Sequence, residues 1–200
     1  DIAIIELVEK VNMTTTIQPV CLPKNGEELP EGSKLYATGW GDVEGMGRVR
    51  SEELKQTMIE SIPFDSCLKR WRWWHNPEVF CAAHDHGSVC DGDSGGPAVH
   101  KADGEWAVHG IIKARVQKPC NSPSMPRGFV KVSAYIKDFI EPYMDSSKRN
   151  PKEGSQSCVT ILADVPFFLA LVDSSSVRQA SSVKISEIKL RIATETGGKR

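Results

Sequence analysis

The chain has 200 residues, of which 40% are hydrophobic and 26% are charged, a balance typical of a folded globular protein. Its 25 basic and 26 acidic residues give a formal net charge of -1 at pH 7. A chain without excess positive charge has no electrostatic attraction for nucleic acids or anionic membranes, so we expect neither as a partner.

Residues 1–130 show the pattern of an all-β protein. Short runs of branched and apolar residues alternate with clusters of Gly, Pro, Asn and Asp, which favour turns. The runs that predict strands are 2–8, 35–38, 57–62 and 106–112.

One helix is expected near residue 140. The apolar residues there recur at helical spacing, and they are Val132, Ile136, Phe139, Ile140 and Tyr143. Ser133 is the candidate N-cap, and Pro142 limits the helix at its other end.

A change of composition near residue 145 predicts two parts, a domain over residues 1–144 and a linker with an extension over residues 145–200. Residues 145–157 are polar and contain Pro, Gly and Ser, and the net charge changes from negative before Asp145 to positive after it. The apolar run at 158–172 includes Asp164 and Pro166 and is shorter than the roughly 20 residues that span a bilayer, so we expect no membrane segment.

Six cysteines favour a disulfide framework, because none forms a Cys-x-x-Cys pair or a zinc-ligand spacing. We therefore expect no metal and an oxidising compartment. Asn12 opens an Asn-Met-Thr glycosylation sequon, which agrees with a secreted, extracellular protein. The cysteines are Cys21, Cys67, Cys81, Cys90, Cys120 and Cys158.

The stretch CDGDSGGPAV places Ser94 between glycines, as a nucleophile would be presented. Glycine at 92 leaves room for an approaching carbonyl, and Gly95 and Gly96 permit a sharp turn. A serine hydroxyl also needs a base to take its proton, normally a histidine that a carboxylate orients.

Through five motifs that occur in the family's order, residues 1–144 resemble the later part of a trypsin or chymotrypsin-like serine protease. The motifs are DIAIIEL, QPVCLP, TGWG, GDSGGP and PRGFVKVSAYIKDFI. The resemblance implies a chymotrypsin-like double β-barrel, of which this chain holds the last strand of the first barrel, the second barrel and a C-terminal helix. It also implies a serine endopeptidase that forms an acyl-enzyme on a polypeptide substrate and uses no cofactor.

The resemblance assigns catalytic roles to residues of the matching motifs. Asp1 is the orienting carboxylate, Ser94 is the nucleophile, and the backbone N–H groups of Gly92 and Ser94 form the oxyanion hole. Asp93 matches the carboxylate that pairs with the new N-terminus after zymogen cleavage. The implied disulfides are Cys67–Cys81 and Cys90–Cys120.

The family's histidine lies upstream of the position of Asp1, whereas all five histidines here follow Asp1 in motifs that belong to the second barrel. We therefore expect the chain as given to be incomplete and inactive alone. Cys21 matches a cysteine that links to an upstream chain in relatives, so Cys21 and Cys158 are expected to lack partners. Leu35 and His100 replace a cysteine pair of many relatives.

The substrate pocket departs from the family pattern. Ser88 stands at its base in place of the aspartate of trypsin-like enzymes, Lys113 and Arg115 replace residues along which substrate lies, and Arg127 replaces a wall glycine. Relatives with arginine at that wall, such as granzymes that cleave after aspartate, use it to bind an acidic side chain.

Alternatives remain open at this stage. Arg115 and Arg127 together fill the pocket in one alternative, and Asp91 neutralises one of them in another. Lys113 is also a candidate partner for Asp1. In the alternative function, Lys113 and Arg115 rebuild the substrate groove, and the chain is an inactive protease-like secreted binding module. The run KRWRWWHN at 69–76 is expected to pack on the domain surface rather than to line a subsite or bind a polyanion.

Overall fold

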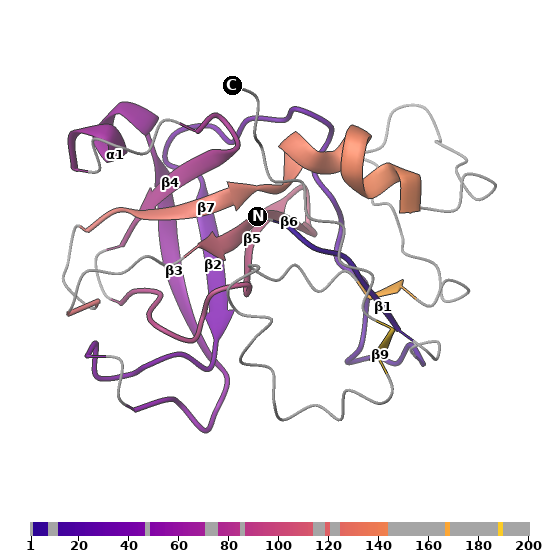
Figure 1. Cartoon of the computed structure of the whole chain (residues 1–200), viewed down its shortest axis with the longest axis horizontal. Coiled ribbons are helices and arrows are strands. Elements are labelled where there is room, and N and C mark those ends of the chain that lie inside the picture. Colours follow the sequence, from indigo (N-terminus) through magenta and orange to yellow (C-terminus); the bar gives the residue numbers. More distant parts are fainter. Residues whose placement is uncertain are drawn as a thin grey trace.

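The protein contains a six-stranded closed β-barrel with a short helical segment directly after its last strand (Figure 1). The computed structural model describes residues 2–7, 12–46, 49–70, 76–84, 87–113, 119–120, 125–143, 167–168 and 188–189. The barrel strands are β2 (Lys34–Gly39), β3 (Lys55–Ile62), β4 (Val79–Ala83), β5 (Pro97–Ala102), β6 (Glu105–Lys113) and β7 (Arg127–Lys131). Their order around the barrel is β2-β3-β4-β7-β6-β5, and all neighbours are antiparallel.

The barrel encloses one cluster of buried side chains, because alternate residues of each strand point inward. In β2 these are Leu35 and Ala37, and Ile59 lies opposite Leu35 on β3. Phe80 of β4 stacks on Phe129 of β7 with ring centroids 5.2 Å apart. The predicted all-β class is thus confirmed.

A second apolar cluster lies between the barrel and the C-terminal helical segment. Ile2 and Ile4 pack in it with Leu22 of the following loop and with Val108 and Phe139. The segment consists of η1 (Val132–Tyr135), η2 (Ile136–Ile140) and η3 (Glu141–Tyr143), so the expected helix is present. Its apolar side faces the cluster, as the helical spacing predicts.

The predicted N-cap is wrong. Lys131 is the N-cap residue of η1 and makes no side-chain cap hydrogen bond. Ser133 lies inside the first turn, is 1% exposed, and donates its hydroxyl proton to the carbonyl of Glu27 at 2.7 Å. A buried hydroxyl needs a partner, and a neighbouring loop supplies one here.

Helix α1 (Phe64–Arg70) was not among the predicted elements. It follows Pro63 and has an acidic residue, Asp65, in its first turn, where the helix dipole favours negative charge. The Cys67–Cys81 disulfide joins α1 to β4. Residues 71–75 of the tryptophan-rich run lie outside the described residues, so its expected packing stays a prediction.

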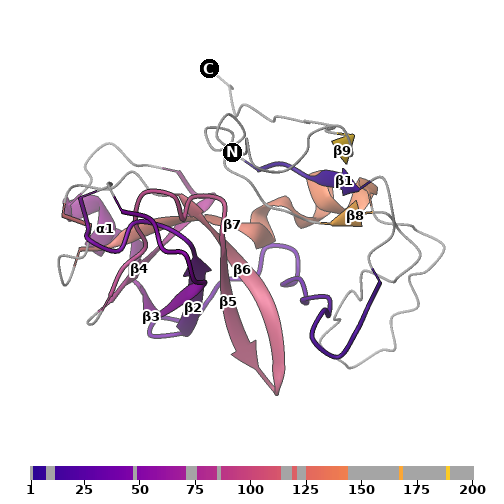
Figure 2. The ribbon, with the colours of Figure 1, turned by 90° about the horizontal axis from the view of Figure 1, so that it is seen from below.

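Strand β1 (Ile5–Leu7) lies outside the barrel, in a small sheet with β8 (Phe167–Phe168) and β9 (Ile188–Lys189) (Figure 2). β8 pairs with one edge of β1 and β9 with the other. The partners of β1 thus come from the C-terminal extension rather than from another barrel. No helix of the described residues is long and apolar enough to cross a membrane.

Both implied disulfides are confirmed, Cys67–Cys81 and Cys90–Cys120. The expectation that Cys21 lacks a partner is wrong, because Cys21 is disulfide-bonded. Its partner lies outside the described residues, and a link from Cys21 to an upstream chain would have to replace this bond.

The positions expected to replace a cysteine pair lie together. Leu35 and His100 are direct register partners between β2 and β5, as the replaced cysteine pair implies.

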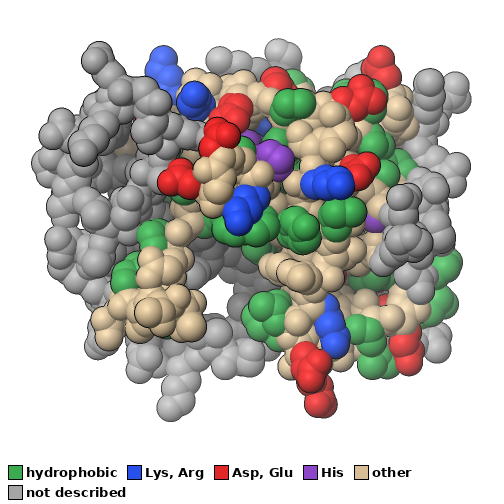
Figure 3. Space-filling view, turned by 180° about the vertical axis from the view of Figure 1, so that it is seen from behind, with side chains coloured by type: hydrophobic (Ala, Val, Ile, Leu, Met, Phe, Trp, Pro, Cys, Tyr) green, Lys and Arg blue, Asp and Glu red, His purple; other side chains and the backbone are tan. Residues whose placement is uncertain are grey.

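On the face shown in Figure 3, acidic and basic side chains are interspersed with apolar ones.

Candidate active site

The loop that carries Ser94 connects to β5 and is anchored on the neighbouring strand β6. The N–H of Gly95 donates to the carbonyl of Ile112 at 2.9 Å, and the N–H of Ile112 donates to the carbonyl of Gly96 at 2.9 Å. Within the loop, the N–H of Asp93 donates to the carbonyl of Cys90 at 3.1 Å. Ser94 is half-buried in this turn.

The glycines of the loop are required by its geometry. Gly92 has φ +100° and Gly95 has φ +86°, conformations that side-chain-bearing residues rarely adopt. A Cβ at Gly96 would lie 2.8 Å from the carbonyl oxygen of Thr38 on β2. Gly92, Gly95 and Gly96 therefore allow a tight turn close to a strand, as the sequence indicated.

Asp93 is half-buried, and its carboxylate accepts hydrogen bonds from backbone amides. Its Oδ1 accepts from the N–H of Gly41 at 2.7 Å, and its Oδ2 accepts from the N–H of Cys90 at 2.8 Å. Burial raises the pKa of Asp93, while these two hydrogen bonds and the charge of Arg50 lower it and Asp42 raises it further.

The glycines of the TGWG motif make room for this carboxylate. A Cβ at Gly39 would lie 2.1 Å from Oδ1 of Asp93, and one at Gly41 would lie 2.4 Å from Oδ2. The family resemblance assigns no role to the glycines of TGWG, so this contact was not predicted. The signal was present, because two glycines that flank one residue at a strand end indicate that another chain segment approaches closely.

The segment after Gly41 folds back on itself and contacts the Ser94 loop. Asp42 and Arg50 form an antiparallel bridge, and the N–H of Val49 donates to Oδ1 of Asp42 at 2.9 Å. The N–H of Asp42 donates to the carbonyl of Asp91 at 2.9 Å. Arg50 lies against Gly92, since a Cβ built there would be 3.3 Å from its guanidinium carbon.

A cavity of about 250 Å³ opens beside Asp93. Asp42 and Lys55 line it with charged groups, and Ser88 and Val89 line it from the loop that precedes Cys90. The cavity therefore combines two carboxylates with one ammonium group.

Arg127 at the start of β7 is buried, with 3% exposure. Its Nε donates to the hydroxyl of Ser88 at 3.0 Å, and its Nη2 donates to the carbonyl of Cys120. Its Nη1 is buried and has no hydrogen-bond partner among the described residues. Burial lowers the pKa of Arg127, and no carboxylate contributes to that shift. The structure thus brings together Ser88 and Arg127, two of the expected pocket residues.

The other expected site residues are placed as follows. Asp1 and Arg115 lie outside the described residues. Lys113 is the last residue of β6 and pairs in register with Gly128. Asn12 is exposed.

The described histidines differ in their contacts. Nδ1 of His100 lies 2.7 Å from the carbonyl oxygen of Lys34. The rings of His100 and His109 meet edge to face with centroids 5.7 Å apart. His84 is buried, and His75 and His86 lie outside the described residues.

The ligand atoms of Asp42, Cys90 and Cys120 lie close enough to one another to hold a metal ion. The two sulfurs are bonded to each other, so they are not available as thiolate ligands.

The barrel and the Ser94 loop have counterparts in known proteins. The family model for Trypsin matches residues 1–140. The chain belongs to the trypsin family, and its fold is a chymotrypsin-like β-barrel.

Similar proteins include chymotrypsin-C of Rattus norvegicus, 40% identical over 140 residues that make up 68% of this chain and 52% of that protein. Chymotrypsin-like elastase family member 3B of Homo sapiens is 35% identical over 145 residues, 70% of this chain and 53% of that protein. Proproteinase E of Bos taurus is 33% identical over 151 residues, 74% of this chain and 58% of that protein. The chain therefore spans about half the length of the relatives it matches.

Proposed function

We propose that this chain carries the nucleophile, the oxyanion hole and the specificity pocket of a secreted serine endopeptidase. Ser94 is the nucleophile, and the N–H groups of Gly92 and Ser94 bind the oxyanion of the tetrahedral intermediate. The tight turn at Gly92 and its anchoring on β6 support this assignment. The disulfides and the exposed Asn12 support secretion and glycosylation.

We further propose that the general base comes from a histidine outside these 200 residues, oriented by Asp1. The contacts of His100 with Lys34 and of His109 with His100 support this view. Residues 1–200 alone should then hydrolyse peptides with a turnover lower by a factor of order 10⁶, because triad members act as a unit. Specific, inhibitor-sensitive hydrolysis by the purified chain would contradict it.

The proposed substrates are polypeptides with Asp or Glu immediately before the cleaved bond. The observation that carries this proposal is the buried Arg127, whose Nη1 has no hydrogen-bond partner among the residues that the structure describes. A buried guanidinium is costly unless it is paired, and a carboxylate entering the pocket offers the planar acceptors that it fits. Ser88 bonds to Nε and adds no negative charge that would compete.

The proposed role of Asp93 is to bind the N-terminus that zymogen cleavage releases. The 250 Å³ cavity beside it and the burial-raised pKa of Asp93 support this role, because an incoming ammonium would offset the cost of a buried carboxylate. The resulting ion pair would hold the Ser94 loop through its neighbour in sequence.

The test uses the complete activated enzyme and peptides that differ only in the residue before the cut: Asp, Asn, Phe or Lys. We expect kcat/KM to be about 10²-fold higher for Asp than for Asn, as for other buried charge pairs. Arg127→Gly should abolish the preference, and Arg127→Lys should retain part of it.

Two outcomes would overturn parts of the proposal. Activity without a preference for acidic residues would refute the role of Arg127 and leave the protease assignment intact. Absence of activity in the complete, activated protein, with peptides still bound, would favour the inactive binding module. In that module, Lys113 at the end of β6 occupies the groove along which substrate would lie.

A further inference from the structure

A second cavity, of about 380 Å³, lies in a part of the barrel that the proposed protease chemistry does not use. Its walls come from residues 27–31, the end of β3, the start of β4 and the end of β7. No residue of the 88–96 loop lines it. Its volume is in the range of sites that bind small ligands.

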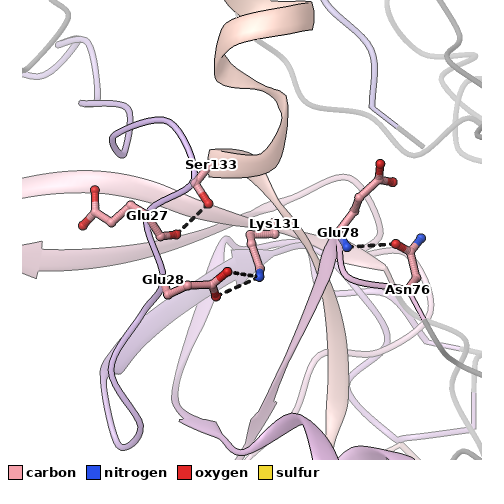
Figure 4. A network of polar contacts seen from close by, with 6 residues as sticks. All are labelled: Glu27, Glu28, Asn76, Glu78, Lys131 and Ser133. Carbon is pink, nitrogen blue, oxygen red and sulfur yellow. Dashed lines mark hydrogen bonds and ion pairs between the residues drawn. The ribbon is translucent and has the colours of Figure 1, made fainter.

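The wall that carries the acidic residues is held by several contacts (Figure 4). The N–H of Gly26 donates to the carbonyl of Ser133 at 2.9 Å, and the hydroxyl of Ser133 donates to the carbonyl of Glu27 at 2.7 Å. The ammonium of Lys131 contacts both carboxylate oxygens of Glu28, at 2.6 and 2.7 Å. This part of the cavity is therefore preorganised, which lowers the entropy lost on binding.

The cavity carries excess negative charge. Glu27, Glu28 and Glu31 line it, and Lys131, paired with Glu28, is the one lysine or arginine among the lining residues that the structure describes. Among the described lining residues, no lysine or arginine pairs with Glu27 or Glu31, and Oε2 of Glu27 accepts a hydrogen bond from the backbone N–H of Lys24 at 2.7 Å. The complementary ligand carries positive charge.

His109 adds a polar group to the cavity wall. It is only 4% exposed, and its ring makes no hydrogen bond to a described residue. Burial lowers the pKa of His109; the nearby His100 lowers it further, and the charge of Glu27 raises it. A neutral imidazole has one acceptor nitrogen, so His109 can accept a hydrogen bond from a ligand N–H.

The remaining lining is apolar. Leu29, Phe64, Val79 and Phe80 are part of it, and they come from the loop before β2, from α1 and from β4. An apolar or aromatic group would bury surface against these side chains.

We infer that this cavity binds a protonated amine on an apolar or aromatic stem, with the ammonium among Glu27, Glu31 and His109. An N–H donor from the ligand would supply a hydrogen bond that the ring of His109 does not make to any described residue. The carboxylates stabilise the ligand charge, and the apolar lining holds its stem. The same chemistry is available from a small amine or from a lysine side chain of a polypeptide.

The test is an NMR titration of the 200-residue chain with phenethylamine, and with phenethyl alcohol as the neutral probe of the same shape. We expect the amine to bind at least about fivefold more tightly than the alcohol, because each carboxylate contributes a modest ion pair. The largest shifts should fall on His109 and on the amides of residues 27–31. A parallel titration with the peptide acetyl-Phe-Lys-amide identifies the source, since tighter binding of the peptide points to a polypeptide partner.

Two variants locate the charge effect. Glu27→Gln combined with Glu31→Gln should bring the amine and the alcohol to equal affinity, whereas Glu52→Gln, an exposed residue outside the cavity, should change neither. His109→Leu should weaken amine binding about tenfold, provided that its spectrum remains that of the folded chain. Equal affinity of the unmodified chain for amine and alcohol, or shifts confined to other residues, would overturn the inference.

Discussion

Gly41→Ala tests whether close contact with the TGWG motif fixes the position of the Asp93 carboxylate. The new Cβ would lie 2.4 Å from the carboxylate carbon and from Oδ2, so the Asp93 side chain must move. The backbone of Gly41 is not in the left-handed region, and alanine adds no strain of its own there. The effect should therefore come from Asp93 alone.

The expected cost follows from the bonds that the movement breaks. Asp93 accepts from the N–H groups of Gly41 and Cys90, and each hydrogen bond to a charged group contributes about 1.5–3 kcal/mol. Because Asp93 is only half-buried, we take the lower end of that range for both bonds. The free energy of unfolding should fall by about 3 kcal/mol.

The assay is urea unfolding of the 200-residue chain, followed by tryptophan fluorescence. Asp93→Ala is the matched background, because it removes the carboxylate that the new methyl group would meet. In that background Gly41→Ala should cost less than about 1 kcal/mol, so the two substitutions are strongly coupled. Equal costs in the two backgrounds would refute the reasoning.

Three further predictions concern the stability of the same chain. The pKa of Asp93 is raised in the folded state, so its contribution to stability is complete below its unfolded-state pKa of about 3.9 and is lost as the pH rises through its folded-state pKa. The free energy of unfolding, measured against pH, should fall over this range, and Asp93→Asn should remove that fall. Gly110→Ala would place a Cβ 2.7 Å from Cζ of Phe80 and should cost about 1–3 kcal/mol in urea unfolding, with partial recovery by Phe80→Leu; an unchanged midpoint would contradict this packing. Replacing both Cys67 and Cys81 by alanine should cost about 3 kcal/mol in the same assay, because their disulfide closes a loop with a sequence separation of 14; a loss below about 1 kcal/mol would show that other contacts hold α1 on β4.

Local sequence patterns located some barrel strands and not others. The runs that become β3 and β6 are long and rich in branched residues, and both were predicted within a few positions. β5 begins with Pro97 and β7 contains Gly128, two residues that are unfavourable within strands. Both strands pair with β6, whose inward-facing side is apolar, and this pairing overrides these preferences.

The candidate site divides in the same way. Ser94 and its glycines lie in one short motif, and the conformation of their turn follows from local residues. The bond between Asp93 and Gly41 joins residues 52 positions apart, and the bond between Arg127 and Ser88 joins residues 39 positions apart. Contacts of this kind depend on how the barrel closes, which no local pattern specifies. The family resemblance indicated Ser88 and Arg127 as pocket residues but not the hydrogen bond between them.

The two strands from the C-terminal extension determine what else can pair with β1. β8 occupies one edge of this strand and β9 the other, so the main-chain donors and acceptors along both edges already face a partner. A strand from any other segment, or from a second molecule, can pair with Ile5–Leu7 only by displacing one of them. The extension thus competes directly with every alternative neighbour of β1, and a chain cut after residue 144 would leave both edges open to such neighbours.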